Sequence, residues 1–213
     1  MALSKKAQTL YAQVTKDGAP RSELKKIAKE IKKDHELAME LWSTAELMPR
    51  MLAALIMNKT LLTQEVIEQL AADLETHSEK ERNHISEWLL ANQLMKSAKT
   101  TALLLTWQDH KSPVLRRLFW YYQARLRWTG KTDHDNTLDL LTTIEEKMET
   151  EVPEVQWTMN FCAAQIGIYV PELRKRCIAL GERVGLYKEE KAVKGCTPSY
   201  LPEFIRIEVE KRA

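Results

Sequence analysis

Three stretches decide the fold: AELMPRMLAALI at 45–56, SPVLRRLFWYYQ at 112–123 and VPEVQWTMNFCAAQIG at 152–167. Each has a proline in or just before its opening turn, followed by an apolar stripe at helical spacing. One such unit cannot bury its own apolar face, so neighbouring units must stack on it. The repetition predicts an all-α fold, a HEAT-like helical-repeat solenoid (an α-α superhelix). An ordinary helical bundle is the alternative.

Helical periodicity extends along most of the chain, which has only 6 Gly and 7 Pro in 213 residues and no convincing strand. We therefore expect a single HEAT-like domain over residues 1–213. Ser22, Thr63 and Ser112 are expected N-caps, and Gly130 is expected to end a helix. The helices expected are 22–33, 35–42, one from 45, 63–76, 79–94, 100–108, 113–129, 133–148, 153–169, 171–185 and 202–209.

Several classes of site are missing from the sequence. The three cysteines, Cys162, Cys177 and Cys196, have no metal-binding spacing and an odd count, so we expect reduced thiols. The five histidines form no metal motif, and no phosphate-binding glycine loop occurs, so we expect neither a metal nor a cofactor. No apolar run is long enough for a membrane span. A monomeric cytoplasmic protein without a membrane partner is the expectation.

The charge is segregated although the net charge is only +2. Residues 1–33 hold nine Lys/Arg against three Asp/Glu, and residues 110–132 hold six against none. Such segregation favours one basic face that could bind nucleic acid. Solvated helix faces that happen to cluster are the alternative.

Two local patterns could carry chemistry. Arg117, Trp120 and Tyr121 share one helical face, and a guanidinium beside aromatic rings suits phosphate and stacking contacts; buried rings with snorkelling arginines are the alternative. His77 and Glu81 lie four residues apart, where a carboxylate beside an imidazole could stabilise a cation or position a water. An exposed polar helix start is the alternative there.

The runs HELAMELWSTAELMPRMLAALI, ADLETH, VLRRLFW and NFCAAQIG, in this order, resemble the AlkD-like family of DNA alkylation repair proteins over roughly residues 30–200. The resemblance implies a HEAT-like solenoid whose basic concave groove binds double-stranded DNA, and an N-glycosylase activity that releases N3- and N7-alkylated purines. It also implies association with the nucleoid when the protein is bound to DNA.

By this resemblance the candidate catalytic positions are His77 and Phe161, where the family has tryptophans, and Glu81, where it has an aspartate. Arg117 keeps the family's backbone-binding arginine. The remaining candidate DNA-binding residues are Arg116, Arg50, Trp120, Lys25 and Lys29. Because three of the four family positions are substituted, the resemblance leaves the enzyme activity open.

Three functions therefore remain under consideration. The first is a DNA glycosylase with an altered site. The second is a non-enzymatic relative that binds DNA without releasing a base. The third is a HEAT scaffold that binds another protein.

Overall fold

The computed structural model describes residues 2–16, 20–130 and 136–212. Within these ranges the regular structure is entirely helical, so the all-α prediction is confirmed. The chain divides into two compact units, Met1–Leu118 (unit 1) and Phe119–Ala213 (unit 2), with the boundary inside one helix. The single domain expected from the sequence stays a prediction. No described helix is long and apolar enough to cross a membrane.

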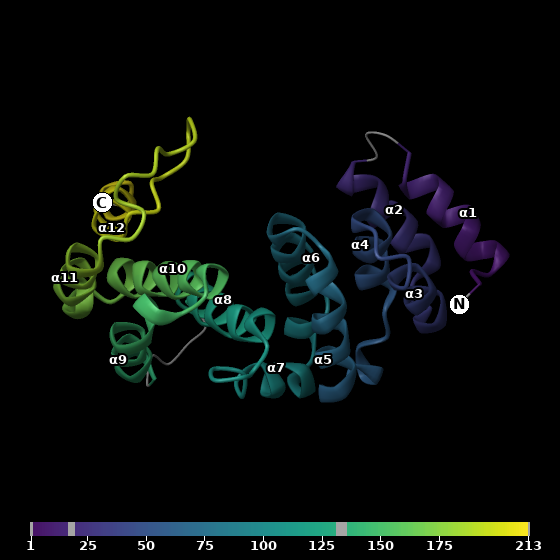
Figure 1. Cartoon of the computed structure of the whole chain (residues 1–213), viewed down its shortest axis with the longest axis horizontal. Coiled ribbons are helices and arrows are strands. Elements are labelled where there is room, and N and C mark those ends of the chain that lie inside the picture. The colour runs from purple at the N-terminus through teal and green to yellow at the C-terminus, as the bar shows by residue number, and fades with distance from the viewer. Residues whose placement is uncertain (1, 17–19, 131–135, 213) are drawn as a thin grey trace. The chain divides into compact units, whose positions relative to one another are not determined.

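Unit 1 is built around a short, almost fully buried helix, α4 (Figure 1). Helices α2, α3 and α6 all pack against it. Six of its ten residues are apolar and buried, because this helix has neighbours on several sides. The helices of unit 1 are α1 (Lys5–Val14), α2 (Arg21–Ile31), α3 (His35–Trp42), α4 (Leu47–Ile56), α5 (Gln64–Asp73), α6 (Glu79–Asn92), α7 (Ala98–Leu104) and the start of α8 (Pro113–Thr129).

Unit 2 is centred on α10, which packs against α9, α11 and α12 (Figure 1). At Gly181 of α11 an added Cβ would lie 2.5 Å from Pro202 of α12, so only glycine allows the two helices to approach this closely. Besides the remainder of α8, the unit contains α9 (Thr137–Lys147), α10 (Pro153–Tyr169), α11 (Arg174–Val184) and α12 (Leu201–Glu210).

Capping chemistry explains where several helices begin. The Thr63 hydroxyl accepts a hydrogen bond from the backbone N–H of Val66, which confirms it as the N-cap of α5. Ser78 caps α6 in the same way. Prolines open α8 and α10, and Gly130, with φ of 63°, follows the last residue of α8, as the sequence predicts.

Some predicted boundaries are wrong. Helix α2 begins at Arg21 after Pro20, so Ser22 is not its N-cap. Ala45 has a positive φ of 57°, and α4 therefore begins only at Leu47. Several predicted helices have different bounds. The predicted helix 100–108 is α7 (Ala98–Leu104), the one from Pro171 starts as a 3-10 turn before α11, and those predicted to end at 33, 76 and 94 end at 31, 73 and 92. The predicted start at 133 lies outside the described residues.

Helix α1 was not predicted from the sequence. It is short, and only Ala7 and Val14 on it are buried. Its N-cap, Ser4, accepts from the Ala7 N–H at 3.2 Å, and the backbone N–H of Ser4 donates to Glu40 of α3 at 2.7 Å. A weak apolar stripe stabilised by tertiary contacts explains why periodicity alone does not indicate this helix.

Candidate nucleic-acid interface

Helices α2 and α6 of unit 1 together carry a basic surface. Arg21 Nη2 lies 3.2 Å from His84 Nδ1, and Lys25 Nζ lies 5.5 Å from the ring centre of Trp88. Lys29 follows Lys25 by one helical turn and is exposed. We call the residues Arg21, Lys25, Lys29, Lys80 and His84 the α2–α6 basic surface.

Two cations of this surface affect the protonation of His84. The pKa of His84 is lowered, first by burial and then by the positive charges of Arg21 and Lys80. His84 is therefore neutral near pH 7 and can donate or accept hydrogen bonds, while the charge resides on the flanking side chains. The indole N–H of Trp88 donates to the Met51 carbonyl at 3.0 Å, which fixes the ring beneath Lys25.

His77 and Glu81, two of the predicted catalytic residues, are brought together at the start of α6. His77 Nδ1 lies 3.3 Å from Glu81 Oε2, and the Ser78 hydroxyl donates to the same oxygen at 3.1 Å. The His77 side chain is only 5% exposed, whereas that of Glu81 is 41% exposed. Hydrogen bonds from His77 and then Ser78 lower the pKa of Glu81, so its carboxylate is ionised at neutral pH.

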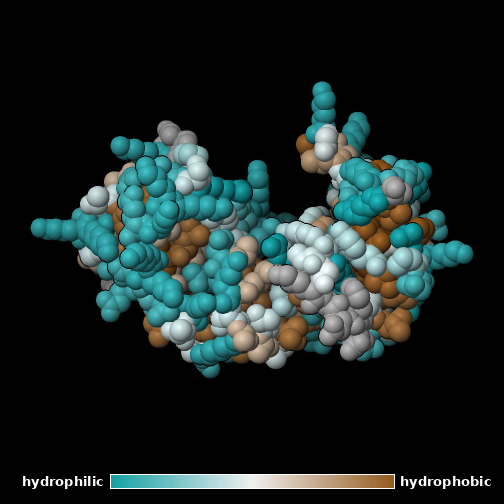
Figure 2. All heavy atoms as spheres, turned by 180° about the vertical axis from the view of Figure 1, so that it is seen from behind, coloured by the Kyte–Doolittle hydropathy of each residue, from teal (hydrophilic) through white to brown (hydrophobic). Residues whose placement is uncertain are grey.

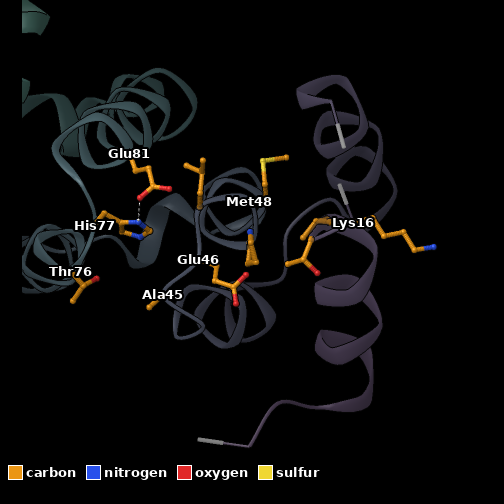
Figure 3. A pocket seen from close by; sticks show the side chains of 11 residues that line it. Lys16, Ala45, Glu46, Met48, Thr76, His77 and Glu81 are labelled. Carbon is orange, nitrogen blue, oxygen red and sulfur yellow. Dashed lines mark hydrogen bonds and ion pairs between the residues drawn. The ribbon is translucent and has the colours of Figure 1, made fainter. Parts of the chain in front are cut away.

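These two residues line a pocket of about 570 Å³ between α1, the start of α4 and the start of α6. Its wall also contains Glu46 and Met48. Figure 3 shows the His77 ring next to Glu81, and the amino group of Lys16 directed away from the pocket. Two carboxylates therefore set the charge inside it, which favours a cationic group over an anionic one.

Arg50 does not belong to the α2–α6 basic surface. It is 3% exposed, and its guanidinium donates to the carbonyls of Trp42 at 3.0 Å and Asp73 at 2.7 Å. The same guanidinium lies 5.1 Å from the ring centre of Trp42. These contacts satisfy backbone acceptors inside unit 1, so we do not include Arg50 among the proposed DNA contacts.

Arg116 and Arg117 of α8, which are predicted to bind DNA, also have partners within the protein. Arg117 is 4% exposed and forms an ion pair with Glu87 of α6. Burial raises the pKa of Glu87, and the nearby Arg117 partly offsets that rise. Arg116 donates to the carbonyls of His110 at 2.7 Å and Lys111 at 3.2 Å, closing the turn before α8. Contact of either arginine with DNA remains a prediction.

The predicted aromatic residues of unit 2 have different environments. Trp120 is 1% exposed and packs edge-to-face on Phe119, so it belongs to the core. Phe161 is partly exposed and lies at the centre of a ring cluster. We call this cluster the α8–α10–α12 aromatic surface; its members are Tyr121, Trp128, Trp157, Phe161 and Phe204.

The sequence pattern had not indicated several of these residues. Trp157 precedes Phe161 by four residues, and Trp128 follows Tyr121 by seven, so helical spacing alone could have grouped them in pairs. On α2, Arg21 precedes Lys25 by four residues, so the same spacing could have indicated it. Among the described residues, no group of three or more His, Cys, Asp or Glu could hold a metal ion.

A profile of the family described as DNA alkylation repair enzyme matches residues 8–192. The chain belongs to the DNA alkylation repair enzyme family. Among solved structures, one described as "a new family of proteins related to the HEAT-like repeat DNA glycosylases with affinity for branched DNA structures" is similar, with a TM-score of 0.71. At 16% identity, over 99% of this chain and 90% of that one, the likeness concerns the fold. No curated protein matches.

The HEAT-like fold predicted from the sequence is therefore confirmed, as is membership of the DNA alkylation repair family. The matched range, 8–192, includes α2, the His77–Glu81 pair and the whole of α10. Hydrophilic residues cover much of the face seen in Figure 2, with hydrophobic atoms visible in separate areas between them.

We predict that Arg50→Met lowers the free energy of unfolding by about 3 kcal/mol, because two buried carbonyl acceptors lose their donor. Urea denaturation followed by circular dichroism measures this. Lys25→Met, on the exposed face of α2, is the matched control and should change stability by less than about 0.5 kcal/mol. Equal effects of the two substitutions would contradict a structural role for Arg50.

Proposed function

We propose that this protein binds double-stranded DNA and releases N3- and N7-alkylated purine bases from it. Membership of the DNA alkylation repair enzyme family supports the substrate class. The single observation that carries the proposal is the ionised Glu81 carboxylate, held by His77 and Ser78 at a pocket lined by the start of α6, the helix that also carries Lys80 and His84 of the α2–α6 basic surface.

The α2–α6 basic surface supports the binding step. Lys25 and Lys29 are exposed and one turn apart, so both can reach phosphates of one DNA strand. Arg21 is exposed, with its guanidinium next to the neutral ring of His84. None of these three cations forms an ion pair with a carboxylate in the described part of the chain. Their charge is therefore available to neutralise phosphates.

The chemical step requires little from the protein. An N3- or N7-alkylated purine carries a positive charge, so the bond between the base and C1′ of the sugar breaks with its electron pair leaving on the base. The base departs neutral and the sugar becomes an oxocarbenium ion. A carboxylate near the sugar stabilises that cation and orients the attacking water, whose proton passes to the carboxylate or to solvent.

Glu81 suits this role because it is ionised and 41% exposed. The buried imidazole of His77 holds one of its oxygens, so the carboxylate is oriented before DNA arrives. Glu46, on another wall of the same pocket, accepts a hydrogen bond from the hydroxyl of Tyr11 and adds a second negative charge. This environment favours a cationic nucleotide over a neutral one.

We predict that Glu81→Gln lowers the rate of methylpurine release from alkylated DNA by about 100-fold, because the amide cannot stabilise the oxocarbenium charge. Chromatography of the freed base measures the rate. Glu75→Gln, an exposed neighbour outside the pocket, is the control and should retain full release. Equal release by wild type and Glu81→Gln would remove Glu81 from the mechanism.

DNA binding without base release is the second candidate. The similar solved structure, from proteins with affinity for branched DNA, favours it. Wild-type protein that binds alkylated duplex yet frees no methylpurine would establish this function in place of the first. In that case the contact between His77 and Glu81 would serve only to hold the first turn of α6.

We predict that Lys25→Gln/Lys29→Gln weakens binding of a plain duplex and makes it less dependent on salt. Each lost phosphate contact should reduce the slope of log K against log salt by about 0.9. Fluorescence anisotropy of labelled duplex over a salt series measures both. The exposed pair Lys175 and Lys191 of unit 2, changed to glutamine, is the control. An unaltered slope in the α2 variant would exclude this surface as the phosphate contact.

A further inference from the structure

Five aromatic rings from three helices meet on unit 2 in the α8–α10–α12 aromatic surface. Phe161 is the central ring. It stacks on Trp157 at 5.4 Å between centroids and 14° between planes, and on Tyr121 at 5.9 Å and 24°. Trp128 and Phe204 meet its ring nearly perpendicularly, at 6.3 Å and 6.1 Å. Mutual packing therefore fixes the orientation of all five rings.

The rings remain accessible to solvent. Trp128 is 38% exposed, and the four others are partly exposed, in contrast with Trp120 on the same helix at 1%. A group of rings that only filled the core would be covered like Trp120. A contiguous, partly exposed aromatic surface is typical of a binding site.

A cation lies against the most exposed ring. The guanidinium carbon of Arg125 is 5.1 Å from the ring centre of Trp128. No carboxylate of the described residues pairs with Arg125, and its buried Nε has no hydrogen-bond partner among them. An aromatic face beside a guanidinium without a carboxylate partner among the described residues matches a nucleotide, which presents a flat base and a phosphate.

We propose that the α8–α10–α12 aromatic surface binds unpaired nucleotides of DNA, with a base stacked on the rings and Arg125 on a phosphate. In an intact duplex the base faces are covered by their neighbours, so only a base outside the stack can use this surface. The inference rests on the proposed function in one respect, that the ligand is DNA. It adds a preference for DNA with a single-stranded segment.

The test compares two labelled probes by fluorescence anisotropy: an oligothymidylate of about 12 nucleotides, within the usual size range of single-strand sites, and a plain duplex. Trp128→Leu and Arg125→Gln should each weaken oligothymidylate binding about tenfold and leave duplex binding within about twofold. Leu138→Ala, which removes an exposed apolar side chain of α9, and Arg183→Gln, which removes an exposed guanidinium of α11, are the controls and should bind both probes as wild type does.

Each outcome either supports or overturns the binding of unpaired nucleotides by this surface. Wild-type protein that binds duplex but not oligothymidylate overturns this inference and leaves the proposed function intact. Oligothymidylate binding without duplex binding supports the inference and contradicts the proposed function. Equal losses for both probes, or none in either variant, overturn the assignment, as does tighter binding of an oligouridylate of the same length. If Trp128→Leu does not fold, Arg125→Gln supplies the same comparison, because its side chain is partly exposed.

Discussion

One buried guanidinium holds the candidate site of unit 1 together. Arg50 sits in an otherwise apolar helix and links the end of α3, through the Trp42 carbonyl, to the end of α5, through the Asp73 carbonyl. The Trp42 indole closes the network by donating to the Asp73 carboxylate at 2.9 Å. Burial lowers the pKa of Arg50 and the Asp73 charge partly offsets this. Burying such a charge costs free energy, and it is tolerated only because the protein supplies hydrogen-bond acceptors in place of water.

The position of the candidate site residues depends on this network, because the segment that carries them follows directly after Asp73. Asp73 ends α5, and after a single 3-10 turn the backbone reaches His77 and the N-cap of α6. The position of α6 then sets where Glu81 faces the pocket and where His84 and Trp88 meet Arg21 and Lys25. Helix α6 thus carries both the Glu81 carboxylate and two members of the α2–α6 basic surface, Lys80 and His84.

The sequence was informative where local chemistry dominates. Proline at the first position of α8 and α10 and the Thr63 cap follow from backbone hydrogen bonding, so the pattern predicts them directly. Likewise, a spacing of four residues placed His77 beside Glu81. Burial was not predictable in this way. Trp120 and Trp128 lie on one helix, yet the first is core and the second exposed, because neighbouring helices decide which face is covered. Arg50 and Arg117 were predicted as DNA-binding cations because the sequence does not report burial, whereas packing gives both of them internal partners.

The proposed function requires bound DNA to lie against α2 and the start of α6. Hydrogen–deuterium exchange of the protein with and without duplex DNA tests it most directly, since amides covered by a ligand exchange more slowly. Slower exchange is expected over 21–31 and 77–88 when DNA is bound. Protection confined to the acidic face of α5, around Glu65 and Glu68, with no change in those two segments, would contradict it.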